Sequence, residues 1–83
     1  TNVNAYPNPT KDKLTIEIAS FEFAHIQTKL YNGLGQIIAE NNTTINEKET
    51  HKQEFDVRNL AKGVYILEVN SGKNKEVIKI VVQ

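Results

Sequence analysis

The 83-residue sequence predicts an all-β domain, and three observations support that prediction. Apolar and polar residues alternate with a period of two in several short segments, which is the pattern of strands with one buried face. Turn-forming residues separate these segments every ~8–12 residues, and no stretch shows a helical period. The hydrophobic residues, 39 % of the chain, include no Trp, Met or Cys, so the core must consist mainly of Ile, Val and Leu, which favour strands.

The first half of the chain contains three predicted strands. Tyr6-Pro7-Asn8-Pro9 is an extended segment followed by a turn, because each proline fixes φ and removes a backbone donor. Alternation over Leu14–Ile18 predicts a half-buried strand. A second strand is predicted at Ile26–Tyr31, and a glycine-containing turn at Asn32–Gly35 joins it to a returning strand at Gln36–Glu40.

The middle of the chain offers little to a core. Residues 41–54 contain one strongly apolar side chain, Ile45, so we expect a loop with exposed edge strands there. Phe55–Val57 resumes the alternation. Residues 58–63 form a short bend that ends in glycine and has room for a brief helical turn.

The most apolar segments lie near the end of the sequence. Val64–Val69 and Val77–Val82 are separated by a polar linker at residues 70–74, so we expect them to pair as antiparallel strands. The whole pattern predicts an immunoglobulin-like β-sandwich of about seven antiparallel strands. An open barrel is the alternative, because strand count and spacing do not separate the two architectures.

Composition excludes several classes of function. Ten basic residues balance ten acidic ones, so no net positive potential favours nucleic acid or an anionic membrane. The absence of cysteine excludes disulfides, thiolate metal ligands and a thiol nucleophile. No apolar run approaches the ~20 residues that cross a bilayer.

Residues with catalytic or metal-binding chemistry are few and scattered. His25 and His51 lie in separate polar stretches without ligand spacing, so we expect both on the solvated surface and predict no metal or cofactor. Ser20 and Ser71 lack a nucleophile-elbow context, and the two glycines of Gly33–Gly35 fit a turn better than a nucleotide site. We therefore predict that the domain is not an enzyme.

Four short motifs occur in order along nearly the whole chain. They are Tyr6-Pro7-Asn8-Pro9 before the Leu14–Ile18 strand; Leu30-Tyr31-Asn32 with Gly35 and Gln36; Leu60, Gly63 and Tyr65; and Lys79-Ile80-Val81-Val82-Gln83. Together they resemble the type A C-terminal sorting domain of type IX secretion, the export route of the Bacteroidetes.

The resemblance implies that residues 1–83 are a single C-terminal sorting domain, a fragment of a larger secreted protein. Its partners are then a cargo domain that precedes it in the same chain, the type IX translocon with its shuttle components, and a sortase. In many members the sortase removes the domain, in the linker near or before Thr1, and the cargo becomes attached to the cell surface. The implied location is export through the periplasm to the cell surface or the medium.

The resemblance and the residue pattern together divide the motifs into two groups. Translocon recognition is assigned to the last strand, which comprises Lys79, Ile80, Val81, Val82 and Gln83. The structural motif residues are Tyr6, Pro7, Asn8, Pro9, Gly35, Leu60, Gly63 and Tyr65. We expect tight sterics to require glycine at position 63, and we expect Tyr65 to fill the core with its hydroxyl at the rim.

The last strand is apolar on both faces apart from one lysine. Alternation points Ile78, Ile80 and Val82 to one side, and Val77, Lys79 and Val81 to the other. The strand is therefore either central, or its second face is a docking surface. At a sheet edge its free backbone groups would accept a partner strand, including that of a second copy. Lys79 would then both prevent unwanted strand pairing at this edge and provide the charge that the translocon recognises.

Two experiments test whether the last strand is the segment that the translocon recognises. Deleting the last few residues, or Lys79→Glu, is expected to block export of a fused cargo while the sandwich stays largely folded. Gly63→Val is expected to impair folding as well.

Two alternatives remain open at this point. One is an accessory carbohydrate-binding or adhesive module, although there is no Trp and most of the six aromatics are expected to pack in the core. These aromatics are Tyr6, Phe21, Phe23, Tyr31, Phe55 and Tyr65. The other is a structural spacer, which predicts that the chain continues after Gln83.

Overall fold

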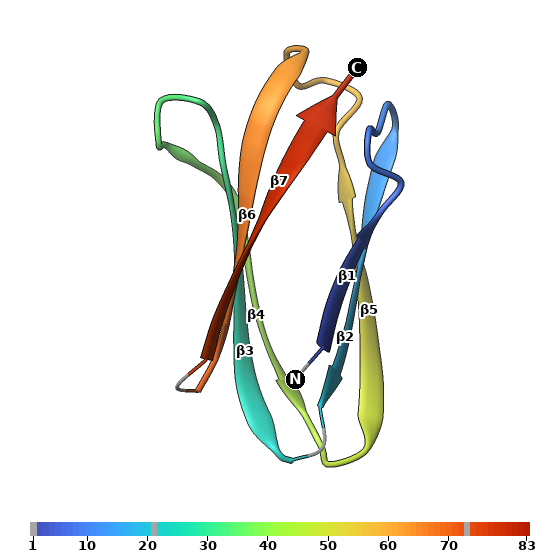
Figure 1. Ribbon diagram of the computed structural model, residues 1–83, viewed down its shortest axis with the longest axis vertical. Coiled ribbons are helices and arrows are strands. Elements are labelled where there is room, and N and C mark those ends of the chain that lie inside the picture. The colour runs from blue at the N-terminus through green and yellow to red at the C-terminus, as the bar shows by residue number, and fades with distance from the viewer. Residues whose placement is uncertain (1, 21, 73) are drawn as a thin grey trace.

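The computed structural model describes residues 2–20, 22–72 and 74–83, and these residues form seven strands and no helix (Figure 1). The strands are β1 (Asn2–Tyr6), β2 (Lys13–Ser20), β3 (Ala24–Tyr31), β4 (Ile37–Ile45), β5 (Glu49–Asp56), β6 (Gly63–Ser71) and β7 (Asn74–Val82). The prediction of an all-β domain is confirmed. Since no helix forms, none of the described residues belongs to a helix that is long and apolar enough to cross a membrane.

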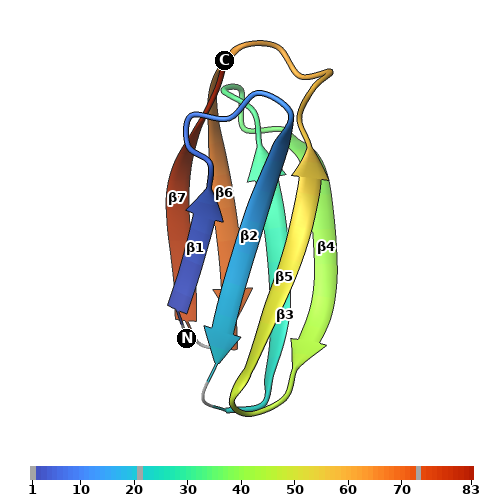
Figure 2. The same cartoon turned by 90° about the vertical axis from the view of Figure 1, so that its right-hand side faces the viewer.

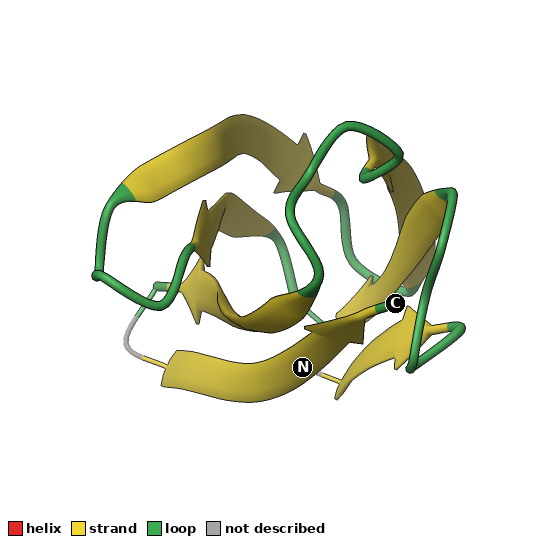
Figure 3. Ribbon diagram, turned by 90° about the horizontal axis from the view of Figure 1, so that it is seen from above, coloured by secondary structure: helices red, strands yellow, loops and turns green. Residues whose placement is uncertain are grey.

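The strands form two sheets that face each other (Figures 1 and 2). One sheet has the order β1-β2-β5 and the other the order β4-β3-β6-β7, and neighbouring strands are antiparallel throughout. The chain crosses from one sheet to the other after β2, β4 and β5. The view from above shows the resulting two layers (Figure 3). This arrangement confirms the predicted sandwich rather than an open barrel.

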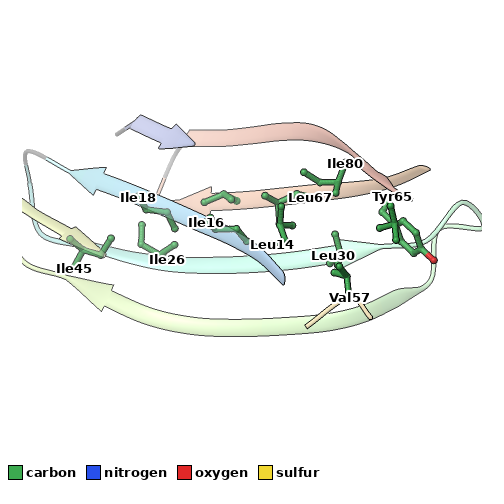
Figure 4. Packing of buried hydrophobic residues seen from close by; sticks show 12 residues of the cluster. Leu14, Ile16, Ile18, Ile26, Leu30, Ile45, Val57, Tyr65, Leu67 and Ile80 are labelled. Carbon is green, nitrogen blue, oxygen red and sulfur yellow. The ribbon is translucent and has the colours of Figure 1, made fainter. Parts of the chain in front are cut away.

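Aliphatic side chains from both sheets fill the space between the layers (Figure 4). Leu14, Ile16 and Ile18 of β2 are fully buried, as their period of two predicts, and Leu67 and Ile80 meet them from the other sheet. The remaining buried hydrophobics are Ile26, Leu30, Ile45, Val57, Tyr65, Val69 and Val82. The predicted Ile, Val and Leu core is therefore present.

At residues 41–54 the predicted edge strands are confirmed, because β4 and β5 are edge strands of their sheets, but the predicted long loop is wrong. β4 continues to Ile45 and β5 begins at Glu49, so only a short turn separates them. These strands carry polar inward side chains that satisfy one another: Gln53 donates from Nε2 to Thr28 Oγ1 at 2.8 Å and accepts from Asn41 Nδ2. A hydrogen-bonded amide replaces aliphatic packing there, so the hydrophobic alternation that marks other strands is missing.

Other element boundaries also shift. The polar β1 was not predicted as a strand, and it pairs with β2 from Asn2 to Tyr6. The predicted β6 and β7 hairpin is confirmed, although its strands extend to Ser71 and from Asn74, into the expected linker. Lys73 of that linker lies outside the described residues. The bend after β5 contains turns and no helical turn.

Candidate functional site

All four motifs lie at one end of the sandwich, the upper end in Figure 1. The first occupies the end of β1 and the connection to β2, and the second closes the hairpin between β3 and β4. The third connects β5 to β6, and the fourth is the end of β7. We call this part of the molecule the motif end.

The first motif and the last strand are held together by the side chain of Asn8. Its Nδ2 donates to the backbone oxygen of Lys79 at 2.8 Å, and its Oδ1 accepts from the backbone nitrogen of Val81 at 3.0 Å. Pro7 and Pro9 have no backbone N–H to donate, so the Asn8 amide supplies the donor that this segment otherwise lacks. The side chain therefore bonds to β7 as a neighbouring strand would.

Thr10 extends this contact along the same edge. Its backbone nitrogen donates to Val81 O, and its backbone oxygen accepts from Gln83 N, both at 2.8 Å. These bonds form a parallel bridge between Thr10 and Val82. Thr10 is 1 % exposed, and its hydroxyl donates to Lys13 O at 2.9 Å. After pairing with β2 through β1, the chain thus moves to the opposite sheet and caps β7.

The contacts of Asn8 and Thr10 reduce the number of free backbone groups at the outer edge of β7. β7 is the edge strand of the four-stranded sheet, as the docking interpretation requires. However, the outward backbone groups from Lys79 O to Gln83 N already bond to Asn8 and Thr10. The expectation that this part of the strand has free backbone groups for a partner is therefore wrong. Side chains, rather than backbone, are what the last residues present.

The side chains of the last strand divide between the core and the outer face. Ile80 is 0 % and Val82 is 3 % exposed, whereas Lys79 is exposed and Val81 is half-buried. Full burial of an aliphatic side chain stabilises by about 1.5–3 kcal/mol. Deletion of the last residues would remove two such side chains, so we expect the truncation to destabilise the sandwich as well as to remove the last strand. Lys79→Glu leaves both in place.

The third motif forms a corner between the two sheets. Tyr65 is buried, and its hydroxyl donates to Ala61 O at 2.6 Å, as in the tyrosine corner of immunoglobulin-like domains. Its ring completes one end of the core (Figure 4), so the predicted role of Tyr65 is confirmed. Leu60 packs partly buried against the core, and its backbone nitrogen donates to Val57 O at 3.1 Å.

Glycine at position 63 is needed for its backbone conformation. Gly63 has φ +150°, which side chains with a Cβ rarely adopt. A Cβ added there would meet no atom within 4 Å. The predicted reason, tight sterics, is therefore wrong.

The second motif builds the hairpin between β3 and β4. Asn32 Oδ1 accepts from the backbone nitrogens of Leu34 at 2.9 Å and Gln36 at 3.0 Å, and its Nδ2 donates to Gln36 Oε1 at 2.9 Å. Gly35 has φ +82° and donates from its nitrogen to Asn32 O. The predicted glycine turn is confirmed. It leaves Leu34 86 % exposed at its tip.

An open hollow of about 740 Å³ lies between the first motif and the end of β7. It is lined by Pro7, Pro9, Lys11, Asp12, Lys13, Arg58 and Gln83. Arg58 Nη2 lies 2.6 Å from Asp56 Oδ2, and this contact lowers the pKa of Asp56 from 3.8 to about 2. The arginine is thus already neutralised by Asp56, and Asp12 offsets one of the two lysines.

The residues considered for catalysis or metal binding are dispersed. His25 is exposed, as expected, and meets Phe23 edge-on with ring centroids 5.2 Å apart. His51 is half-buried with Nε2 shielded from solvent and unbonded in the described structure, so the expected solvated position is wrong. Ser20 donates from Oγ to Glu22 O at 2.7 Å. Within the described residues no group of three or more His, Cys, Asp or Glu side chains could hold a metal ion.

Exposed aromatic rings do not form a binding platform in the described part of the chain. Tyr6, 42 % exposed, lies at the motif end, whereas Phe23, 58 % exposed, follows β2 at the other end. Only Tyr65 among the described aromatics is buried, with Tyr31 and Phe55 half-buried, so core packing of most aromatics was overestimated. Phe21 lies outside the described residues.

The sequence motifs predicted which residues build the motif end, but they did not predict the contacts between these residues. Asn8, Gly35, Gly63 and Tyr65 were expected as structural residues, and each has an identifiable backbone or hydrogen-bonding role. The contact between Asn8 and β7 was not anticipated, since no local pattern signals a hydrogen bond across 73 residues.

Comparison with known proteins identifies a family for this chain. A family model described as secretion system C-terminal sorting domain matches residues 4–83, a range that contains all four motifs. The search of curated proteins gave no match.

Proposed function

Since the chain belongs to the family of secretion system C-terminal sorting domains, we propose that it directs its cargo through the type IX translocon by presenting the outer side chains of Lys79–Gln83. A domain of this family is a secretion signal within a larger cargo chain, and it implies export across the outer membrane to the cell surface or the medium. The proposal concerns which residues the translocon reads.

The observation that supports this proposal is the hydrogen-bonded contact between the first motif and the last strand. Asn8 and Thr10 hold the backbone of β7 from Lys79 to Gln83, while Lys79 itself remains exposed on the outer face. A cation on a fixed strand is a good recognition element because little conformational freedom is lost on binding. The first motif thereby supports the last one.

Further steps belong to the same proposal. A shuttle component carries the exported chain from the translocon, a sortase cleaves in the linker before the domain, and the cargo is then anchored at the cell surface. Edge strands offer a route to self-association, and on β7 this route is limited to the part that Asn8 and Thr10 leave uncovered.

The test is export of a reporter protein with the domain fused to its C-terminus and a periplasmic signal peptide at its N-terminus. The fusion is expressed in a host with an active type IX system, and the reporter is measured in periplasm, cell surface and medium. Lys79→Glu is expected to retain the reporter in the periplasm. Lys48→Glu is the matched control, because Lys48 is exposed in the turn between β4 and β5, far from the motif end.

Thermal melting of both purified variants separates recognition from folding. Lys79 is exposed and lacks an ion pair among the described residues, so both variants are expected to melt within a few degrees of the parent domain. Normal export of a folded Lys79→Glu fusion would refute the role of Lys79. Cleavage is followed separately, as the size of the released reporter.

A further inference from the structure

The outer face of the four-stranded sheet changes character along its strands. Cross-strand neighbours at the motif end form two rows, which are Val64 with Val81, and Ile37, Tyr31 and Ile66 with Lys79. The next row contains Glu40, Lys29, Glu68 and Val77, and the row after it contains Asn42, Gln27, Asn70 and Lys75. The face is therefore apolar at the motif end, then charged, then amide-rich. We call the five apolar residues of the first two rows the apolar surface.

The apolar surface is accessible. Val64 is 48 % and Ile37 is 50 % exposed, and Leu34 at the adjoining hairpin tip is 86 % exposed. The alternate residues of β6 and β7, including Leu67 and Ile80, are buried in the core, so Val64 and Val81 face outward. An exposed cluster of this kind marks an interaction site more often than isolated apolar residues do.

The other sheet provides an internal comparison. Its outer rows pair Asn4 with Glu17 and Lys52, and Tyr6 with Thr15 and Glu54. Lys52 Nζ lies 3.8 Å from Glu17 Oε2, and the Tyr6 hydroxyl donates to the same oxygen at 3.0 Å. That face is polar and internally paired. Of the two outer faces in the described structure, only that of the four-stranded sheet has a row-by-row cluster of apolar residues, and the cluster lies at the motif end.

Lys79 is the charge at the border of the apolar surface. The other lysines of this face have acidic neighbours: Lys75 Nζ lies 3.7 Å from Glu68 Oε2, and Lys29 stands between Glu40 and Glu68 in the ladder. The hydrogen bond from Asn70 and these lysines hold the pKa of Glu68 below its ordinary value. Lys79 has Ile66 as its cross-strand neighbour instead, and no ion pair among the described residues.

We propose that the apolar surface and Lys79 together dock a protein of the export machinery that presents an apolar patch with a carboxylate facing Lys79. This inference rests on the proposed function and names the surface that performs it. Each motif contributes: Tyr31 from the second, Val64 within the third, Val81 and Lys79 from the fourth, and Asn8 of the first fixes the strand that carries them.

The charge pattern favours a protein partner over a lipid surface. An anionic membrane attracts clusters of basic residues, whereas this face offers one unpaired lysine with Glu40 and Glu68 in the next row. A buried apolar contact with one charge pair at its rim is the usual composition of a protein interface.

The test compares two identical substitutions on the same face. Val64 and Val77 are 48 % and 59 % exposed, but Val77 lies in the charged row beside Glu68. In the reporter fusion, Val64→Asn is expected to lower export about tenfold or more, as loss of a central interface residue does. Val77→Asn and the conservative Val64→Ile are expected to export normally. Melting of each purified domain verifies the fold.

Photo-crosslinking identifies the partner. A benzophenone amino acid at Leu34, beside the apolar surface, is expected to crosslink in exporting cells to an envelope protein whose depletion stops export. The same probe at Val77 should give no such product. The inference is supported by that product together with loss of export in Val64→Asn.

Several outcomes would overturn the inference. Equal export of the Val64→Asn and Val77→Asn fusions would overturn the inference and leave the proposed function intact. Retention of the unsubstituted fusion in the periplasm would instead refute the proposed function itself. Two further results would assign the surface elsewhere: Val64-dependent binding of the domain to phosphatidylglycerol vesicles, or a dimer in light scattering that Val64→Asn dissociates.

Discussion

Replacing Asn8 with alanine removes the side chain that joins the first motif to the last strand. Two hydrogen bonds are lost, from Asn8 Nδ2 to Lys79 O at 2.8 Å and from Val81 N to Asn8 Oδ1 at 3.0 Å. A typical hydrogen bond contributes about 0.5–1.5 kcal/mol net, so the pair is worth about 1–3 kcal/mol. Asn8 is exposed and water can replace part of the loss, so we expect about 1–2 kcal/mol.

Thermal melting and amide exchange measure this loss. For a domain of this size, 1 kcal/mol corresponds to roughly 4–8 °C in Tm. The Val81 amide should exchange faster with solvent, because its acceptor is gone. Asn4→Ala is the matched control, since Asn4 is an exposed asparagine of β1 whose side chain makes no hydrogen bond to the described residues.

A second variant tests the donor separately. Asn8→Asp keeps an acceptor for Val81 N–H but places a carboxylate oxygen near Lys79 O, which is also an acceptor. We expect it to be less stable than Asn8→Ala at neutral pH and to recover below about pH 4, where a protonated carboxyl donates again. Equal Tm values for Asn8→Ala and Asn4→Ala, together with an unchanged exchange rate of the Val81 amide, would refute the stabilising role of the Asn8 side chain.

Three further variants test the corner and its surroundings. Tyr65→Phe removes the hydroxyl that donates to Ala61 O, and chemical denaturation should show a loss of about 0.5–1.5 kcal/mol. Gly63→Ala should lower stability by about 1–3 kcal/mol at φ +150°, and an unchanged melting curve would contradict the backbone argument. Asp56 has a pKa lowered to about 2 by hydrogen bonds from Arg58, so the stability it contributes is present above pH 3.8 and lost as the pH falls through about 2. Melting across that range should show a weaker pH dependence for Asp56→Asn than for the parent.

Local signals in the sequence predicted the elements whose inward side chains are aliphatic. β2, β3, β6 and β7 were predicted from their apolar residues, and the short connection between β6 and β7 predicted their pairing. The pairs β2 with β5 and β3 with β6 join strands that are not consecutive in the chain. β1 was not predicted, and the polar parts of β4 and β5 were expected only as edge strands within a loop. The inner face near Gln53 is stabilised by amide hydrogen bonds to Thr28 and Asn41, which an apolar pattern cannot reveal.

The candidate site was predicted in its residues but only partly in its geometry. The hairpin at Asn32–Gly35 and the burial of Tyr65 follow from local rules of turns and strands. The capping of β7 does not, because it depends on how the two sheets place distant segments side by side. The reason for glycine at position 63 also required the backbone angle.

The two hydrogen bonds between the Asn8 side chain and β7 also determine the stage of folding at which the surface around Lys79 reaches its final structure. Its hydrogen bonds join residues 71 and 73 positions apart, which makes them among the most non-local contacts the chain can form. Such contacts require closure of nearly the entire chain, so a state with either terminus unfolded lacks them. A partly folded domain can therefore pair β7 with β6 but cannot cap the outer edge of β7, so the capped strand marks a domain in which the first and last motifs have both folded.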